Sequence, residues 1–325
     1  MVGVAIKRRI RPWALPYLHR WQWFYDVSRS IWRAFSWRGV WLDLLDRRKV
    51  LKNPVRILQD YQGIRFVLYP WDKANLLNLV RRTYDRAEFL AIPRLVKGGD
   101  IAFDLGANAG VYSVLLSRLC GPSGRVWAFE PVPDTYWRLR ETLALNRCEN
   151  VVAVQAAVAD RQGTATMNLF DPQFSEWSTL GKPSMLGPDG RRVSPSESVE
   201  VPSHALDQFC AEHGIERVQF LKVDVEGFEL SVFRGAETLL REQRVDFICF
   251  EISKDPLKGA GVQSRDVFKA LEVHGYRSYR FEKAKGTFEG PVEDTPEEWT
   301  NFFASYKDLS NVGELAGNAQ ESQTR

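Results

Sequence analysis

The fold of this 325-residue chain is decided by the stretch Ile101-Ala102-Phe103-Asp104-Leu105-Gly106-Ala107-Asn108-Ala109-Gly110. An apolar run ends at an acidic residue, a Gly-x-Asn-x-Gly loop follows, and residues 111–116 have the composition of a helix. A strand, a small-residue turn and a helix let the backbone of an α/β sheet approach a nucleotide-like ligand closely. Glycine suits this loop because a Cβ would block the ligand or forbid a positive φ angle.

A second strand with a carboxylate at its tip comes next along the chain. Residues 125–130 read Arg-Val-Trp-Ala-Phe-Glu. An acid at the tip of the second strand of such a sheet is placed to accept hydrogen bonds from ribose hydroxyls. The glycine loop and Glu130 together therefore predict a cofactor that contains a nucleoside.

The acid before the loop distinguishes between cofactors. A dinucleotide site would normally show Gly-x-Gly-x-x-Gly, with the pyrophosphate at the start of the helix. Here Asp104 precedes the loop, and a carboxylate repels a pyrophosphate but attracts the ammonium end of S-adenosylmethionine. The order Asp-x-Gly-x-x-x-Gly therefore favours a methyl donor over NAD.

Composition places the chain among ordinary globular proteins. Hydrophobic residues make up 44% and charged residues 26%, and the net charge of +3 is too small to predict nucleic-acid binding. The four cysteines form no C-x-x-C pair, which argues against structural zinc and a disulfide framework and suits a reducing compartment. The sequence shows neither a signal peptide nor a window of roughly 20 apolar residues, so we expect a cytoplasmic protein.

Residues 1–52 differ from the rest of the chain. They hold six of the eleven tryptophans, and their Arg and Lys residues far outnumber their acids. One interpretation is a helical extension whose aromatic residues cover the catalytic domain or a partner subunit. The other is peripheral contact with a membrane, where Trp lies at headgroup level and Arg meets anionic lipid.

The rest of the chain predicts one α/β domain with flanking segments. Residues 53–99 are expected to form a lead-in strand and helix, residues 100–308 the main domain, and residues 309–325 a flexible tail. Alternating strands and helices predict a doubly wound, mostly parallel sheet with an antiparallel edge strand. The expected strands lie near 100–105, 125–130, 151–156, 218–224, 246–252, 276–282 and 301–305, and the expected helices near 110–119, 133–146, 227–241 and 264–274.

An irregular insertion is expected at residues 170–200, between the third and fourth strands. Pro, Gly and Ser are frequent there, and pairs such as Asp171-Pro172 are turn signals. A loop of this length in a compact domain is usually functional or disordered. We expect it to cover the substrate.

Three acids and a lysine gather at the ends of two later strands. Asp224 follows an apolar run that contains Lys222, Glu226 comes two residues later, and Glu251 ends the run 246–250. Ligands of open α/β sheets bind at the carboxyl ends of the strands, so these acids should border the same crevice as the glycine loop. Such crowding of carboxylates is costly and is often found where function requires it.

Three motifs stand in a fixed order along the chain. They are Asp-x-Gly-Ala-Asn-x-Gly with a following Tyr at 104–112, Phe-Glu-Pro at 129–131, and Phe-Leu-Lys-x-Asp-x-Glu-Gly-x-Glu at 220–229 with Gly-Ala close behind. This pattern resembles the FkbM family of S-adenosylmethionine-dependent methyltransferases. The resemblance implies a class I (Rossmann-like) methyltransferase fold, S-adenosylmethionine as cofactor, and methylation of a hydroxyl on a sugar, a glycolipid or a secondary metabolite.

The resemblance also implies roles by position. The methionyl end of the cofactor would lie at Asp104 and Gly106, its ribose at Glu130, and its adenine beside the residues that follow the third strand. The expected cofactor-binding set is Asp104, Gly106, Asn108, Gly110, Tyr112, Glu130, Ala157, Val158 and Asp160. The expected substrate-binding residues of the insertion are Trp177, Ser178 and Thr179, of which Trp177 stands where the family commonly has a small residue.

A hydroxyl that attacks a sulfonium methyl group should lose its proton to a base. Our hypothesis assigns this role to Asp224 or Glu226, with Lys222 or Glu251 tuning the base. Each has a structural alternative: Lys222 as an ion-pair partner, Glu226 as an acid at a helix start, and Glu251 as a structural acid. No metal is expected, because the acids show no fixed ligand spacing.

Two other functions stay open. One is a non-catalytic Rossmann-like module that docks a membrane or a partner through residues 1–52. The other is an NAD-dependent oxidoreductase, against which the missing third glycine of the loop counts.

Overall fold

The computed structural model describes residues 57–61, 63–68, 87–170, 178–181, 185–186, 192–310 and 312. The tryptophan-rich segment 1–52, the residue Trp177 and the tail beyond 312 lie outside these described residues. The chain divides into two compact units, which are residues 1–84 with 172–175, and residues 85–171 with 176–325. Within the described ranges, no helix is both long and apolar enough to cross a membrane.

In the first unit the structure describes one antiparallel hairpin. Its strands are β1 (Ile57–Tyr61) and β2 (Ile64–Leu68), paired so that Tyr61 lies opposite Ile64. Gly63 in the turn has a φ of 73°, which a glycine adopts at little cost. The strand expected in the lead-in segment corresponds to β2.

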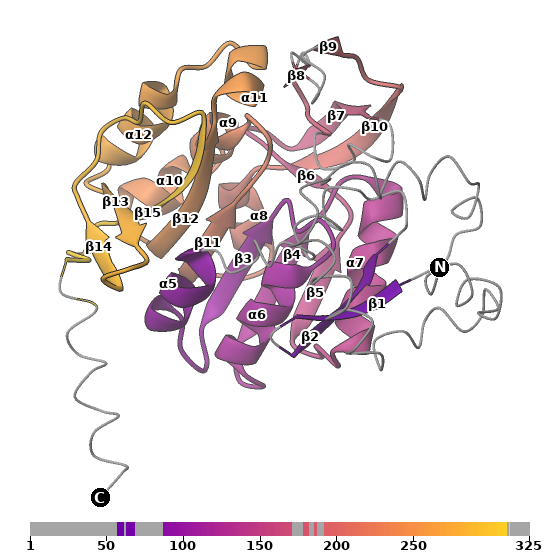
Figure 1. Ribbon diagram of the computed structural model, residues 1–325, viewed down its shortest axis with the longest axis horizontal. Helices are drawn as coiled ribbons and strands as arrows, with labels where there is room; N and C mark the ends of the chain where they lie inside the picture. Colours follow the sequence, from indigo (N-terminus) through magenta and orange to yellow (C-terminus); the bar gives the residue numbers. More distant parts are fainter. Residues whose placement is uncertain are drawn as a thin grey trace, which may run out of the picture. The chain divides into compact units, whose positions relative to one another are not determined.

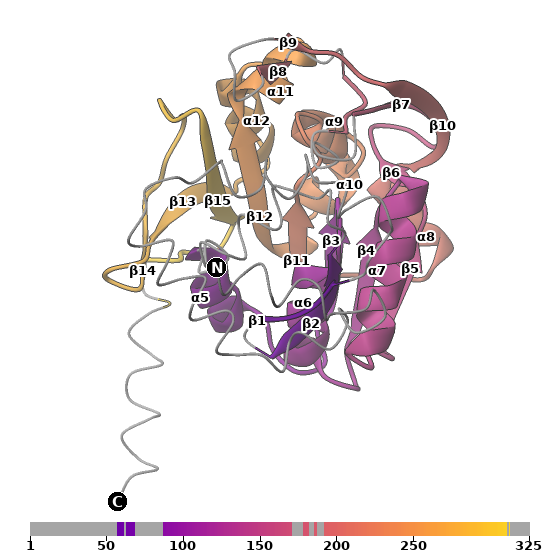
Figure 2. The same cartoon turned by 45° about the vertical axis from the view of Figure 1, so that its right-hand side comes forward.

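An eight-stranded sheet forms the centre of the second unit (Figures 1 and 2). Its strands are β3 (Ile101–Leu105), β4 (Arg125–Phe129), β5 (Val151–Val154), β11 (Val218–Val223), β12 (Val245–Ser253), β13 (Arg277–Glu282), β14 (Thr287–Glu289) and β15 (Trp299–Ser305). They run in the order β14-β13-β15-β12-β11-β3-β4-β5. The strands from β5 to β12 are parallel, and β15, β13 and β14 are antiparallel to their neighbours. The doubly wound, mostly parallel sheet is confirmed.

The antiparallel part of the sheet is larger than the single expected strand. β15 lies between β12 and β13, with β14 outermost. Phe302 and Phe303 are both buried, although neighbouring side chains of a strand point to opposite faces. Phe302 packs in the cluster that contains the helix residue Phe268, and Phe303 packs on the other face with Tyr279 and Phe288.

Helices cover both faces of the sheet. Because neighbouring side chains of a strand point to opposite faces, their contacts show which helices pack on which face. On one face, α5 (Ala87–Leu95) and α6 (Val111–Cys120) pack in a cluster with Ala102, Phe220 and Cys249 of the strands. The helix α7 (Pro133–Leu145) lies beside α6 (Figure 2). The strand neighbours of these three residues point the other way, toward α8 (Leu206–Glu212), α9 (Glu229–Arg234), α10 (Glu237–Arg241) and α12 (Ser264–Glu272). The short helix α11 (Lys254–Gly259) follows β12 directly.

Two expectations about elements are corrected. The single helix expected near 227–241 is two helices, α9 and α10, separated at Gly235 and Ala236. Strands that were not expected flank the insertion at 170–200: β7 (Gly163–Leu169) and β10 (Glu197–His204) form a small sheet with β6 (Ala157–Val158). Within the insertion, β8 (Met185–Leu186) and β9 (Arg192–Val193) form a short hairpin. Only one side of β10 is apolar, at Val199 and Val201, so the sequence signal is weak there.

The break between α9 and α10 generates a prediction about stability. A Cβ at Gly235 would lie 2.1 Å from the carbonyl oxygen of Ala159, which is backbone and cannot move aside easily. Gly235→Ala is therefore expected to lower the free energy of unfolding by about 1–3 kcal/mol in urea titrations. Gly98→Ala is the matched control, because nothing lies within 4 Å of a Cβ there. Equal stability of the two variants would contradict this account of the close approach.

Candidate active site

The glycine loop after β3 is tied to the strands on both sides of it. Gly106 has a φ of 75°, and a Cβ on it would lie 1.8 Å from the carbonyl oxygen of Asp224. The backbone N–H of Gly106 donates to the carbonyl oxygen of Phe129 over 3.0 Å, and that of Asp224 donates to Leu105 over 3.1 Å. The loops after β3 and β11 therefore lie in direct contact at the point where the strand order reverses, which is where open α/β sheets bind ligands.

Asp104 is fully buried next to this loop. The hydroxyl of Ser113 donates to its Oδ2 over 2.6 Å. Its Oδ1 has no hydrogen-bond partner among the described residues. Burial raises the pKa of Asp104, and the positive charge of Lys222 opposes this rise. A buried acceptor without a protein donor suits a donor or a cation supplied by a ligand, such as an ammonium group.

Glu130 lies directly after β4 and is only 6% exposed. Its two carboxyl oxygens accept hydrogen bonds from the backbone N–H groups of Asn108 and Val132, each over 2.9 Å. Burial raises the pKa of Glu130 to about 7, against the effect of these two hydrogen bonds and of the Arg138 charge. Each oxygen has a second lone pair, so the carboxylate can also accept ribose hydroxyls.

Two further residues expected around the cofactor have clear packing roles. Gly110 precedes α6 with a φ of 86°, and a Cβ there would lie 2.7 Å from Leu139 of α7, so this glycine lets the two helices approach closely. The ring of Tyr112 faces Lys222, whose Nζ lies 4.5 Å from the ring centroid. The Tyr112 hydroxyl lies 3.5 Å from a carboxyl oxygen of Glu88.

The residues expected beside the adenine lie at β6. Ala157 and Val158 are buried and pair with β10. Asp160 is exposed, with its carboxylate 3.3 Å from the guanidinium of Arg161, and its backbone N–H donates to the hydroxyl of Ser231. The Asp160 carboxylate thus forms an ion pair with Arg161 at the surface.

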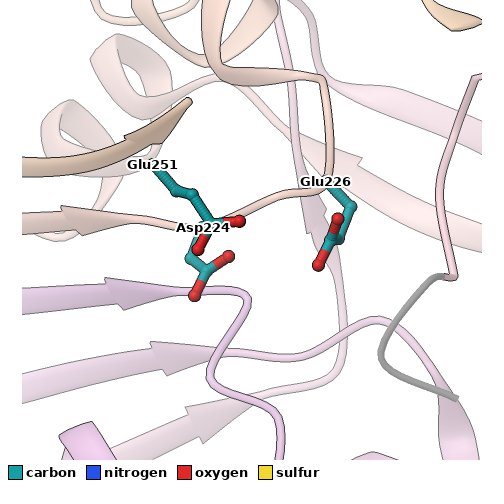
Figure 3. Close-up of side chains that lie close together, drawn as sticks. All are labelled: Asp224, Glu226 and Glu251. Carbon is teal, nitrogen blue, oxygen red and sulfur yellow. The ribbon is translucent and has the colours of Figure 1, made fainter. Parts of the chain in front are cut away.

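Asp224, Glu226 and Glu251 form a cluster of acids. Asp224 and Glu226 follow β11, whereas Glu251 lies within β12, which continues to Ser253 and not to residue 250 as expected. Oxygen atoms of the three side chains lie within 4.8 Å of one another. Figure 3 shows the carboxyl groups of Asp224 and Glu251 side by side, with Glu226 facing them from the following loop. Strand register explains the first pair, because Val223 pairs with Phe250 and the acids come one residue later on each strand.

Lys222 is the cation of this cluster. It is 2% exposed, and its Nζ donates to Asp224 over 2.7 Å. Burial favours the neutral amine, but the charges of Asp224 and Asp104 outweigh this effect and raise the pKa of Lys222. Lys222 thus offsets the negative charge of Asp224 and of Asp104.

The loop that carries Glu226 has an unusual backbone held by two neighbours. Glu226 has a φ of 50°, and Gly227 has a φ of 95°. The Glu229 carboxylate accepts hydrogen bonds from the N–H groups of Val225 and Gly227, over 3.4 and 3.2 Å. The Thr179 hydroxyl donates to the carbonyl oxygen of Glu226 over 2.8 Å. The 178–181 segment of the insertion is thus in direct contact with the acid cluster.

The structure adds residues that the sequence analysis did not single out. They are Glu88, Ser113, Arg138 and Glu229, all buried. Glu229 is the last acid of the third motif, and burial raises its pKa to about 7. Ser113 follows the glycine loop by one helical turn, which is a signal in the sequence. For Glu88 and Arg138, neither spacing nor composition shows that they reach the site.

Comparison with curated proteins identifies relatives of known activity. The chain is 30% identical over 174 residues to the hexuronic acid methyltransferase AglP of Haloferax volcanii, covering 53% of this chain and 61% of that protein. It is 30% identical over 163 residues to the 31-O-demethyl-FK506 methyltransferase FkbM of Streptomyces tacrolimicus, covering 44% and 61%. The 2-O-methyltransferase NoeI of Sinorhizobium fredii is 27% identical, covering 54% and 73%. The chain thus spans about three fifths of the length of the first of these relatives.

Among solved structures, the fibrillarin of Aeropyrum pernix with natively bound S-adenosyl-L-methionine aligns with a TM-score of 0.38 and 16% identity, covering 77% of this chain and 82% of that one. The family described as "Methyltransferase FkbM domain" matches residues 104–278, which is more than half of the chain. This match begins at Asp104 and includes the glycine loop, Glu130 and the acid cluster. The chain belongs to the FkbM methyltransferase family.

Proposed function

We propose that this protein transfers a methyl group from S-adenosylmethionine to a hydroxyl of a small molecule, such as a sugar or a secondary metabolite. The observation that carries the proposal is the pair of buried carboxylates, Asp104 and Glu130, on either side of the glycine loop. The proteins named as relatives, which include methyltransferases of a hexuronic acid and of 31-O-demethyl-FK506, support the same class of reaction.

The cofactor supplies a methyl group already activated on a sulfonium, so the protein mainly has to bind, orient and exclude water. In our proposal the Asp104 oxygen that lacks a hydrogen-bond partner among the described residues receives the ammonium group, and Glu130 receives the ribose hydroxyls. Gly106 lets the two loops meet without a side chain between them. Ala157 and Val158 flank the adenine.

In the same proposal the acid cluster receives the acceptor. Asp224 or Glu226 takes the proton of the attacking hydroxyl, which is a contribution of roughly 10²–10⁴ in rate for a well-placed base. Lys222 fixes the orientation of Asp224 through their hydrogen bond. Glu251 accepts a second hydroxyl of the acceptor, and Thr179 holds the loop of Glu226 in place.

The other expected functions receive less support. Asp104 disfavours the pyrophosphate of NAD at this loop, because like charges repel. Residues 1–52 lie outside the described residues, so their contact with a membrane or a partner stays a prediction, as does a cytoplasmic location. The acceptor proposed here is a small molecule.

Binding of the product S-adenosylhomocysteine tests the cofactor pocket. Calorimetric titration should show micromolar affinity in the wild type. Asp104→Asn and Glu130→Gln keep the shape of each side chain but lose its charge, and each should weaken binding by about tenfold or more. Asp134→Asn is the control, because this acid is exposed in the first turn of α7. A folded wild type without affinity would refute the proposal.

Methyl transfer tests the assignment of the base. Asp224→Asn and Glu226→Gln should be compared with the wild type in the transfer of labelled methyl groups to a panel of hexosides and hexuronides. Replacing the base should reduce turnover by roughly 10²–10⁴, while affinity for S-adenosylhomocysteine stays nearly unchanged. Glu242→Gln, a change at an exposed acid after α10, is the control. If both cluster variants turn over like the wild type, neither acid is the base.

A further inference from the structure

We infer that Arg138 of α7 is a positioning residue for cofactor binding, acting on Glu130 both through Asn108 and through its charge. The inference rests on the proposed function, because it concerns the same pocket. It assigns a role to a helix residue that lies outside the three motifs of the family pattern.

A chain of hydrogen bonds links the three residues. Arg138 is 3% exposed, and its Nη2 donates to the side-chain oxygen of Asn108 over 2.8 Å. The backbone N–H of Asn108 in turn donates to Glu130 over 2.9 Å. The guanidinium therefore fixes the residue that presents one of the two N–H donors to the carboxylate.

The backbone of Asn108 explains why such a support is needed. Its φ is 48°, in the left-handed region that residues other than glycine adopt only at a cost, although asparagine tolerates it better than most. The N–H of Asn108 points to Glu130 in this conformation. The bond from Arg138 to the Asn108 side chain stabilises that conformation within the glycine loop.

Charge gives Arg138 a second effect on the same carboxylate. Burial raises the pKa of Glu130 to about 7, and the charge of Asp104 on β3 acts in the same direction. The N–H groups of Val132 and Asn108 and the charge of Arg138 on α7 act against this rise. Removing the guanidinium charge therefore raises the pKa of Glu130 further.

Whether ligand affinity rises or falls with pH depends on which form of Glu130, ionised or protonated, binds the ligand. Ionised Glu130 can accept two backbone N–H groups and ribose hydroxyls together, whereas a protonated carboxyl uses one oxygen as a donor. Affinity for an adenosine ligand should therefore rise with pH through the pKa of about 7 and level off at higher pH, where Glu130 is fully ionised. Without Arg138 the same rise should occur at higher pH.

The test is calorimetric titration of the full chain with S-adenosylhomocysteine from about pH 6 to about pH 9. Arg138→Met should lose affinity severalfold near neutral pH, because a higher pKa leaves less of Glu130 ionised there. This loss should shrink toward alkaline pH, where Glu130 is ionised in both proteins. Arg138→Lys keeps a charge and should recover most of the affinity near neutral pH.

Thr142→Val is the matched control on the same helix. Thr142 is fully buried, its hydroxyl has no hydrogen-bond partner among the described residues, and its methyl group lies near Gly110. This change perturbs the packing of α7 without changing charge, so affinity should stay unchanged at every pH. Unfolding curves of each variant show whether the helix remains folded.

The outcomes separate the inference from the proposed function. A loss in Arg138→Met that is equal at all pH values, or a lysine variant as weak as the methionine variant, would show a structural role only and overturn the inference. A wild-type affinity that does not change with pH would overturn it as well, even if Arg138→Met fails to fold. A folded wild type that does not bind at any pH would instead refute the proposed function.

Discussion

The close approach of Gly106 to the carbonyl oxygen of Asp224 is the constraint on which the site depends. A Cβ at Gly106 would lie 1.8 Å from that oxygen, so a larger residue would push apart the loops after β3 and β11. This contact places the glycine loop, which follows Asp104 of β3, directly beside the acid cluster. A cofactor bound by one loop and an acceptor bound by the other would then lie next to each other, which is the geometry that a direct transfer between them requires.

Several charged groups of the site are buried, and three of them have partners that offset the cost of burial. Lys222 pairs with Asp224, Ser113 donates to Asp104, and two backbone N–H groups donate to Glu130. Burying carboxylates costs free energy unless hydrogen bonds or cations offset it. The remaining unsatisfied oxygen of Asp104 is an acceptor that a cationic ligand can complete. A ligand that donates a hydrogen bond or carries a positive charge would therefore complete the environment of Asp104.

Much of this arrangement could be predicted from the sequence, for a physical reason. Parallel strands buried on both faces are short apolar runs, and their carboxyl ends lie along one edge, so acids such as Glu130 and Glu251 could be placed there without coordinates. The sequence did not show which helix residues contact which loop residues. The bond from Arg138 to Asn108 depends on how α7 is rotated against the loop, which no spacing in the sequence encodes. The small sheet of β7 and β10 was missed because few of its side chains are buried.

We expect the methyl donor and the acceptor to bind side by side at the ends of β3, β4 and β11. A crystal structure of the protein with S-adenosylhomocysteine tests it most directly. The ribose hydroxyls should lie at the Glu130 carboxylate and the amino group toward Asp104. The sulfur should face the cluster of Asp224, Glu226 and Glu251. A ligand bound elsewhere, or one whose sulfur faces away from this cluster, would contradict it.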